Sequence, residues 1–365
     1  GGFAPYPTTH VHDELHARCL VLDDGKVKLA LVVCDLLGLH RSVSVEARRL
    51  IQEATGITPE NVMISATHTH SAGTALGSSR FVSDQTLDDY QRFLARRIAD
   101  GVHRAKNLLR PAEIAFGVID VPEHLINRRW FVREGKGTPN HFGKIDRVKK
   151  TSGPAGSPDL VEPAGPIDPA LPFIALREPA GRPISVYAAY SVHYAGDSGP
   201  AHISADYFGM FCEALKRLQG GAEGDPPFVA LMANATSGDI NLNQDNFRGK
   251  NPKKTPYFRT RAVAEDLAGK VNAALAGVTW KDHAELDARF REPGIAWRTM
   301  EPELLAWAKE IEAKAPSDRE VGVGAQILGH LGIRQMRLLS RQEKKYIGLR
   351  GFDLDVVATV HLEAL

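Results

Sequence analysis

The fold is decided by the stretch Asn61-Val62-Met63-Ile64-Ser65-Ala66-Thr67-His68-Thr69-His70-Ser71, in which a short apolar run ends abruptly in two histidines. Residues 62–66 have no polar face and no helix cap, so they indicate a buried strand rather than an amphipathic helix. Side chains alternate across a strand, and we expect His68 and His70 to face one cavity if the extended geometry persists to residue 70. Neutral imidazole is a common zinc ligand, so the pair indicates a metal site.

A lone His-x-His pair also has a simpler explanation, namely two hydrogen-bonded loop histidines. A second pair of this kind, His10-Val11-His12, lies in a turn-rich segment near Pro5 and Pro7. No apolar strand precedes it. We therefore expect the second pair to bind no metal.

Two further apolar runs end in polar residues in the same way. Ile184 to Val192 is followed by His193, and Phe228 to Met232 is followed by the polar segment 234–241. In open α/β sheets, ligands gather beyond the carboxyl ends of the strands. We expect the three strand ends to meet at one site.

The order of elements predicts an α/β fold with mixed β-sheets flanked by helices, a layered α/β sandwich that opens with an antiparallel hairpin. The hairpin signal is Asp23-Asp24-Gly25-Lys26 between the apolar runs 15–22 and 27–34. Periodicity and capping residues predict helices at 43–55, 86–109, 206–218, 260–276 and 302–315, and strands at 113–121 and 353–362. Glycine, proline and lysine dominate residues 135–172, which we expect to be irregular.

Composition excludes several classes of function. The 365 residues carry 45 basic and 44 acidic side chains, a net charge of +1, which gives no support to nucleic-acid binding. No stretch approaches the roughly 20 apolar residues that cross a bilayer, so we expect no transmembrane segment. Three cysteines, Cys19, Cys34 and Cys212, fit neither a disulfide framework nor a zinc ribbon. We predict a single domain over 1–365 with an irregular insertion at about 134–172, with the alternative that the C-terminal part of this domain is missing. The sequence leaves the oligomeric state open.

Several blocks, in order, resemble the neutral/alkaline non-lysosomal ceramidase family over roughly Val11 to Asn243. The blocks are Val11 to Arg18, Asn61 to Ser71, Ile126 to Arg129, Gly165 to Pro169, His193, Ile203 to Tyr207 and Thr236 to Asn241. Members of that family are zinc-dependent amidases that release a fatty acid from ceramide, a sphingolipid. The resemblance implies a Zn²⁺ cofactor, a lipid or other N-acyl amide substrate, and an exported, periplasmic or secreted protein.

The resemblance also implies roles for individual residues. His68 and His193 correspond to two zinc ligands, and His70 and Arg128 correspond to residues that contact the substrate around the scissile amide. Asp239 either orients a ligand histidine or caps the turn after its strand. Asp35 has the same two alternatives, and we expect Ser71 and Ser237 to be turn hydroxyls, since neither lies in a Gly-x-Ser-x-Gly elbow.

Two departures from the family pattern bear on the reaction. Ceramide-cleaving members carry a serine in Gly-Asp-Val-Ser-Pro-Asn, and Asn241 stands at that position here. Its amide could orient water or hold a carbonyl oxygen. The family's other zinc ligands are a glutamate after a Pro-Gly turn and a tyrosine. This chain has no Pro-Gly-Glu; Asp353 to Leu365 resembles the strand that leads to it, with Glu363 and Tyr346 as weak substitutes.

Together these features predict a metal-dependent hydrolase, a zinc amidase acting on an N-acyl substrate. Two alternatives stay open. One is zinc-dependent hydrolysis of an unrelated ester or small polar substrate, since one fold hosts many chemistries. The other is a catalytically degenerate domain that only binds a ligand.

Overall fold

The computed structural model describes residues 7–77, 82–139, 145–154, 157–220, 226–296, 302–303, 305–306, 335–340 and 355–361. The chain divides into two compact units. The first comprises Pro7–Gly137 with Arg147–Phe290, and the second comprises Thr138–Asp146 with Arg291–Leu365 and the residues Gly2–Tyr6. This division does not decide whether the units fold independently, so the expectation of one domain stays a prediction.

The first sheet of the first unit has the order β2-β3-β4. Strands β2 (Ala17–Asp23) and β3 (Lys28–Cys34) form an antiparallel hairpin, and β4 (Val62–Ala66) pairs with β3 in parallel. The hairpin turn needs a residue with positive φ, which Gly25 supplies at +87°. The predicted opening hairpin is therefore confirmed.

Two helices pack beside this sheet. Helix α1 (Arg41–Thr55) ends at Gly56, whose left-handed backbone forms the C-cap. Helix α2 (Asp89–Asn107) begins with a capping box between Asp88 and Gln91. The helices lie against each other, and α2 also contacts β2. Their apolar faces and the sheet share one core, built from residues such as Val32, Val43, Ile51, Ile98 and Val102.

The second sheet has the order β15-β13-β12-β5 and is mixed. Its strands are β5 (Glu113–Asp120), β12 (Ala170–Arg177), β13 (Pro183–Tyr190) and β15 (Val229–Asn234). Only β13 and β15 are parallel, so their carboxyl ends lie side by side, with Tyr190 opposite Asn234. Helices α3 (Asp206–Leu218) and α4 (Phe258–Ala274) pack together on this sheet.

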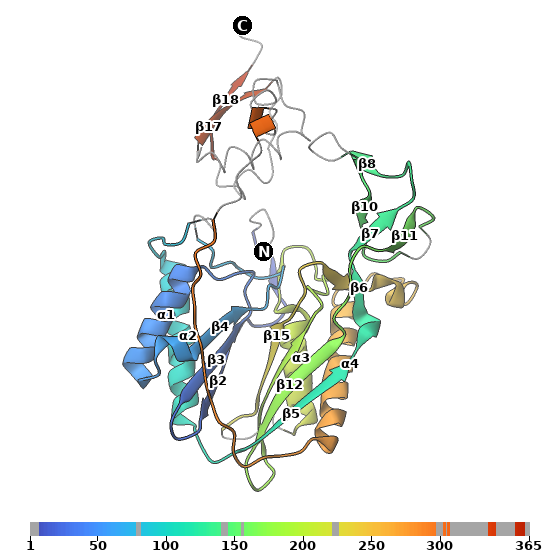
Figure 1. Ribbon diagram of the computed structural model, residues 1–365. Coiled ribbons are helices and arrows are strands. Elements are labelled where there is room, and N and C mark those ends of the chain that lie inside the picture. The colour runs from blue at the N-terminus through green and yellow to red at the C-terminus, as the bar shows by residue number, and fades with distance from the viewer. Residues whose placement is uncertain are drawn as a thin grey trace. The chain divides into compact units, whose positions relative to one another are not determined.

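The two sheets face each other with a pair of helices outside each, which gives a helix, sheet, sheet, helix sandwich (Figure 1). The contact between the sheets is apolar and contains Leu20, Val33, Leu176, Leu231 and Ala233. The layered α/β sandwich predicted from the sequence is confirmed.

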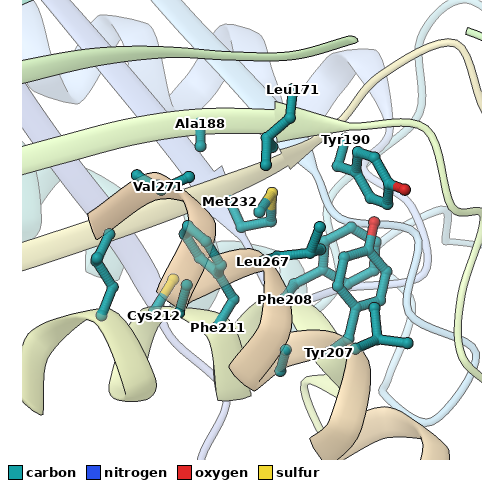
Figure 2. Packing of buried hydrophobic residues seen from close by; sticks show 14 of the residues in the cluster. Leu171, Ala188, Tyr190, Tyr207, Phe208, Phe211, Cys212, Met232, Leu267 and Val271 are labelled. Atoms are coloured by element: carbon teal, nitrogen blue, oxygen red, sulfur yellow. The ribbon is translucent and has the colours of Figure 1, made fainter. Parts of the chain in front are cut away.

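Figure 2 shows the core between the second sheet and its helices, where Tyr190, Tyr207, Phe208, Phe211 and Met232 pack together. Burial of each such side chain contributes roughly 1.5–3 kcal/mol. Both tyrosine hydroxyls have acceptors: Tyr190 donates to the carbonyl of Val121 (2.5 Å) and Tyr207 to that of Val192 (2.8 Å). The core thus anchors the chain that leads to His193.

Short elements complete the described structure. Strand β1 (His10–Val11) pairs with β14 (His202–Ile203), and β6 (Leu125–Asn127) pairs with β16 (Ile240–Leu242). The single-turn helices are η1 (Pro59–Asn61), η2 (Pro122–His124), η3 (Gln244–Phe247) and η4 (Leu275–Gly277).

The expectation that residues 135–172 are irregular is wrong in part. Strands β10 (Val148–Lys150) and β11 (Leu160–Pro163) both pair with β7 (Arg129–Val132), and β8 (Thr138–Pro139) pairs with β9 (Ile145–Asp146). Backbone pairing of very short strands tolerates the glycines and prolines at their ends.

Strands β17 (Gln335–Ser340) and β18 (Asp355–His361) form a parallel pair, and β18 confirms the strand expected at 353–362. The helix expected at 302–315 lies mostly outside the described residues, as do Tyr346 and Glu363. Among the helices described, none is both long and apolar enough to cross a membrane.

Candidate metal centre

His68 lies just after the carboxyl end of β4, where the chain stops following the strand. Thr67 still donates its backbone N–H to Cys34 O (2.9 Å) and His68 donates to Leu36 O (3.0 Å). The φ angle of His68 is +64°, in the left-handed region that non-glycine residues seldom adopt. The extended geometry therefore ends before residue 70, and that expectation is wrong. Such strain costs about 1–3 kcal/mol and is concentrated at functional sites.

The two imidazoles nevertheless meet, because the turn at His68 brings its ring edge to His70. Their ring centroids are 4.9 Å apart, at an interplanar angle of 83°. The Nε2 atoms are 3.3 Å apart. Two nitrogens bound to one zinc ion at about 2.0–2.1 Å in a tetrahedral arrangement would be separated by about the same distance.

His193 joins this pair from the second sheet. It follows β13, and its backbone N–H donates to Ile240 O (3.1 Å). Its ring centroid lies 4.7 Å from that of His68 and 5.3 Å from that of His70. One ligand atom from each of the three residues lies within 4.8 Å of the other two. Two sheets therefore contribute to one imidazole triad, defined as His68, His70 and His193.

Backbone carbonyls orient two of the rings. The Nδ1 atom of His68 lies 2.7 Å from Leu37 O, and that of His193 lies 2.9 Å from Ser237 O. A carbonyl only accepts, so each Nδ1 carries the proton and each Nε2 keeps its lone pair. This arrangement is typical of metal-binding histidines. The three residues therefore fit a zinc ion.

The surroundings of two of the rings favour their neutral form. Burial, and after it the neighbouring His68 and His193, lower the pKa of His70 to about 4. Burial also lowers the pKa of His193. Neutral imidazole is the state that binds a metal, so this direction favours metal binding by His70 and His193.

The third strand end joins the other two through Asn234, at the end of β15. Its Nδ2 donates to Thr67 O (2.8 Å), from the first sheet, and lies 3.5 Å from His193 O. The three strand ends thus lie together. The strand-end pattern in the sequence points to Asn234, but its bridging contacts depend on the packing of the two sheets.

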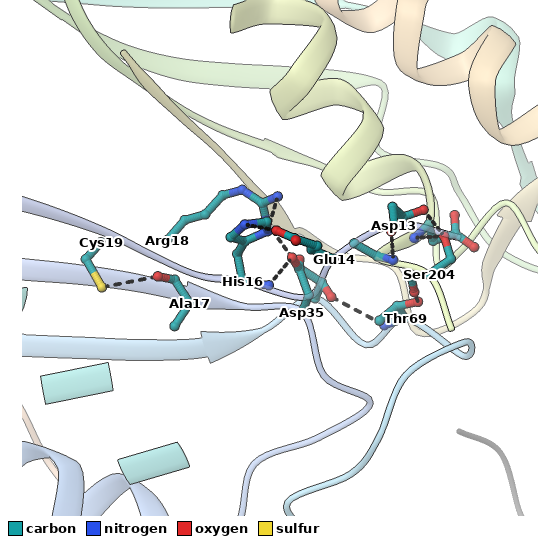
Figure 3. A network of polar contacts seen from close by, with 12 residues as sticks. Asp13, Glu14, His16, Ala17, Arg18, Cys19, Asp35, Thr69 and Ser204 are labelled. Carbon is teal, nitrogen blue, oxygen red and sulfur yellow. Dashed lines mark hydrogen bonds and ion pairs between the residues drawn. The ribbon is translucent and has the colours of Figure 1, made fainter. Parts of the chain in front are cut away.

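Further contacts fix the segments that carry the triad. The ring of Tyr194 stacks on His70, with centroids 4.1 Å apart and an interplanar angle of 15°. Thr69 donates its hydroxyl to Ser204 O (3.0 Å), and Asp13 accepts from the Ser204 hydroxyl (2.7 Å), as Figure 3 shows. Nothing in the local sequence around these residues indicates their partners.

Arg128 lies beside the triad. It follows β6, and its guanidinium donates to Gly238 O. Its charge is among the causes that lower the pKa of both His70 and His193. Among the described residues no carboxylate forms an ion pair with its guanidinium.

Asp239 and Asn241 do not contact the triad through any described hydrogen bond. The Asp239 carboxylate accepts from Asn127 Nδ2 (3.1 Å), and Asn241 Nδ2 donates to the Ser152 hydroxyl (3.1 Å). Backbone carbonyls orient the rings of His68 and His193, and the orienting role expected for Asp239 stays a prediction.

Asp35 serves the fold rather than the triad. It is buried, pairs with Arg18 and accepts the backbone N–H of His16 (3.0 Å), as Figure 3 shows. Burial raises the pKa of Asp35 and the Arg18 charge opposes that rise. Neither expected role of Asp35 is observed.

The pair His10 and His12 lies apart from the triad and has aromatic partners. His12 stacks on Tyr257, with centroids 3.6 Å apart, and His10 contacts His202 at 4.6 Å. The cysteines are free, and burial raises the pKa of the Cys19 thiol to about 12.

A second cluster of possible ligands lies between η2 and the middle of α4. Glu123, His124 and Asp266 also bring one ligand atom each within 4.8 Å of the others. His124 Nε2 donates to Asp266 (2.7 Å), and the Lys270 ammonium contacts both Glu123 (2.6 Å) and Asp266.

The fold and site together define an α/β sandwich protein with an imidazole centre at the ends of its strands. The family model described as neutral/alkaline non-lysosomal ceramidase, N-terminal, matches residues 5–260. The chain belongs to this family.

The chain is also similar to individual proteins. The neutral ceramidase of Pseudomonas aeruginosa is 24% identical over 313 residues, which cover 81% of this chain and 42% of that protein. A solved structure described as "Ceramidase complexed with C2" covers 71% of this chain and 37% of its own, with 20% identity and a TM-score of 0.49. The matched part of the chain thus spans less than half the length of either protein.

A different family matches the end of the chain. The GTP cyclohydrolase II model matches residues 296–361. The riboflavin biosynthesis protein RibBA of Chlorobium phaeovibrioides is 51% identical over 45 residues, which cover 12% of this chain and 11% of that protein. The expectation that residues 353–365 continue the ceramidase resemblance is therefore wrong.

Proposed function

We propose that the first unit is a zinc-dependent hydrolase of an N-acyl amide, a ceramide-like lipid or another acyl amide. The observation that carries the proposal is the triad itself: three imidazoles from two sheets, with the Nε2 atoms of His68 and His70 3.3 Å apart. Three protein ligands and one open position are typical of catalytic zinc.

His68 and His193 are the zinc ligands that the family resemblance implies. The contacts of their Nδ1 atoms with backbone carbonyls leave each Nε2 atom free to bind the metal. The resemblance gives His70 a substrate-contacting role, but its spacing from His68 supports a role as the third nitrogen donor. When bound, zinc would polarise the scissile carbonyl and lower the pKa of a coordinated water toward about 7.

The remaining roles belong to residues around the triad. Arg128 is positioned to bind the carbonyl or an anionic group of the substrate, because its planar guanidinium presents several donors. Tyr194 holds the ring of His70 by stacking. Asn241, where ceramide-cleaving members carry serine, supplies no hydroxyl, so we place no nucleophile on the protein; its amide contacts Ser152.

The experiment is metal analysis of the full chain after zinc loading, followed by a screen of N-acyl amides and esters. We expect about one tightly held zinc per chain and faster turnover of amides than of esters. No retained zinc would leave only a degenerate ligand-binding domain, and preference for esters would favour the alternative hydrolase. The proposal uses residues of the first unit alone and assigns no reaction to residues 296–361. The family also supports export, which a fractionation experiment would test.

A further inference from the structure

A cavity of about 710 Å³ in the first unit has not been assigned a role. This is the size of a cleft that holds a small-molecule ligand. Its walls come from three segments of the chain, and the lining residues are Ser152, Gly153, Asp197, Ser198, Gly199, Pro200, Gln244, Asp245, Phe247, Arg248, Asn251, Lys254, Thr255, Pro256 and Arg259.

The cavity shares segments with the triad. Ser71, the residue after His70, donates its hydroxyl to that of Ser198 (2.9 Å), which lines the cavity. The segment from His193 to Ser198 runs from the triad into the same wall. On another wall, Ser152 accepts from Asn241. The cavity and the triad therefore lie on the two sides of shared segments, 193–198 and the Ser71–Ser198 contact.

The lining is mixed: polar groups and apolar surface, including that of Phe247, Pro200 and Pro256, contribute about equally. An acyl chain placed here would leave the polar groups without partners, which is costly. The cavity therefore suits the amine side of an N-acyl amide rather than its fatty acyl side.

The two carboxylates in the lining already have donors. Asp197 caps α4: it accepts from the backbone N–H groups of Arg259 (2.6 Å) and Thr260 (3.1 Å). Asp245 accepts from Arg248 (2.6 Å). Both carboxylates of the lining are therefore already engaged as hydrogen-bond acceptors.

Two cations that line the cavity, Lys254 and Arg259, have donors without a hydrogen-bond partner among the described residues. In the described part of the chain, the Lys254 ammonium has no hydrogen-bond or ion-pair partner. Arg259 Nε is buried without an acceptor, since the nearest carboxylate oxygen, on Asp197, is 3.8 Å away. The buried Nε of Arg259 cannot reach a bound group, so of these two cations the Lys254 ammonium is the donor available to one.

We propose that this cavity receives the amine side of the substrate and that this side carries an anion, so the substrate class is an N-acyl amide of a carboxylate- or phosphate-bearing amine. Lys254 supplies the charge-assisted hydrogen bond. The inference rests on the proposed amidase function and narrows its substrate.

The test compares a matched pair of substrates on the zinc-loaded full chain. N-dodecanoylglycine carries a carboxylate, and N-dodecanoylglycinamide replaces it with a neutral amide of the same shape. We expect kcat/KM for the anionic substrate to be about tenfold higher, as one charge-assisted contact allows. The preference should decrease as salt rises. N-dodecanoyl phosphoethanolamine, compared with N-dodecanoylethanolamine, shows whether phosphate serves better than carboxylate.

Two lysines of one loop supply the variant and its control. Lys254 lines the cavity, whereas its exposed neighbour Lys253 does not. K254Q should lower the ratio of anionic to neutral kcat/KM about fivefold or more, and K253Q should leave both values unchanged.

The outcomes separate this inference from the proposed function. If amides are cleaved but the neutral substrate is preferred, or K254Q leaves the ratio unchanged, the inference is overturned and the amidase stands. If no amide is cleaved, the proposed function fails, and calorimetric binding of N-dodecanoylglycine decides: weaker binding to K254Q than to K253Q supports the anion site, and equal binding overturns it.

Discussion

Two places in the first unit gather three possible metal ligands, and they differ in charge. In the imidazole triad all three donors are imidazole rings. In the second cluster, Glu123, His124 and Asp266 supply two carboxylates and one ring. By ligand charge alone the acidic cluster is the better site for a hard divalent cation.

The second cluster already holds a cation of its own. The Lys270 ammonium lies 2.6 Å from Glu123 Oε1 and also contacts Asp266. Burial by itself would raise the pKa of Asp266, but hydrogen bonds from Lys270 and His124 outweigh it and lower the pKa. A metal would have to displace this lysine, whereas the triad has no internal cation. Proximity of possible ligand atoms is thus insufficient to define a metal site. The atoms must also be free of a cationic side chain that already neutralises them.

The largest expected effect is a loss of zinc affinity, and it distinguishes the imidazole triad from the second cluster. H68A or H193A should lower zinc affinity by more than about 100-fold, since even loss of a group that supports a ligand costs 10–100-fold. H70A should also weaken binding if His70 is the third donor. Titration calorimetry and metal analysis measure this.

The control for these variants is H124A, which removes the imidazole of the second cluster and should leave zinc content unchanged. Equal loss of zinc in H124A would mean that the second cluster, and not the triad, is the metal site.

The next effect concerns how the triad is held together. N234D replaces the amide donor between Thr67 O and His193 O with a carboxylate, which these carbonyls repel. We expect unfolding free energy of the metal-free protein to fall by about 1–3 kcal/mol and zinc to bind more weakly. Urea unfolding and zinc titration test both. Unchanged zinc affinity in a destabilised N234D would show that the bridge serves stability alone.

A smaller effect is expected at the second cluster. K270M removes the cation shared by two carboxylates, and we expect a loss of about 0.5–1 kcal/mol because all three side chains are partly exposed. Zinc content should stay unchanged. K28M, which breaks the single pair of Lys28 with Asp23, is the matched control and should cost less. A gain of a second zinc in K270M alone would show that the lysine is what excludes a metal.

The smallest effect is a pH dependence. The folded protein holds the pKa values of Asp266 and Glu123 below their ordinary values of 3.8 and 4.5. A depressed carboxyl pKa stabilises the fold above the unfolded pKa, and this stability is lost as pH falls. The difference in stability between the natural chain and K270M should therefore be constant near pH 6–7 and shrink below about pH 4.5. A difference that persists at pH 3 would contradict this origin.

Local pattern predicted most elements near the triad. The apolar run before His68 is β4, the run before His193 is β13, and the Asp-Gly turn closes the hairpin of β2 and β3. These predictions held because side-chain periodicity and turn chemistry act over a few residues. The pattern failed at His68, where hydrogen bonds to Leu36 and Leu37 from another strand's loop impose a left-handed backbone.

The end of the chain shows another limit. Periodicity predicted a strand at 353–362, and β18 lies there, but a strand pattern carries no family signal. The match of residues 296–361 to GTP cyclohydrolase II came only from comparison with other sequences.

The sequence by itself determined the layered α/β architecture and the histidines at two strand ends, because short-range patterns encode strands, helices and turns. Only the tertiary structure decided that His68, His70 and His193 share one space, that Leu37 and Ser237 orient two of the rings, and that Asn234 joins the sheets. The physical reason is that these contacts join residues far apart in sequence, and their geometry follows from how two sheets pack.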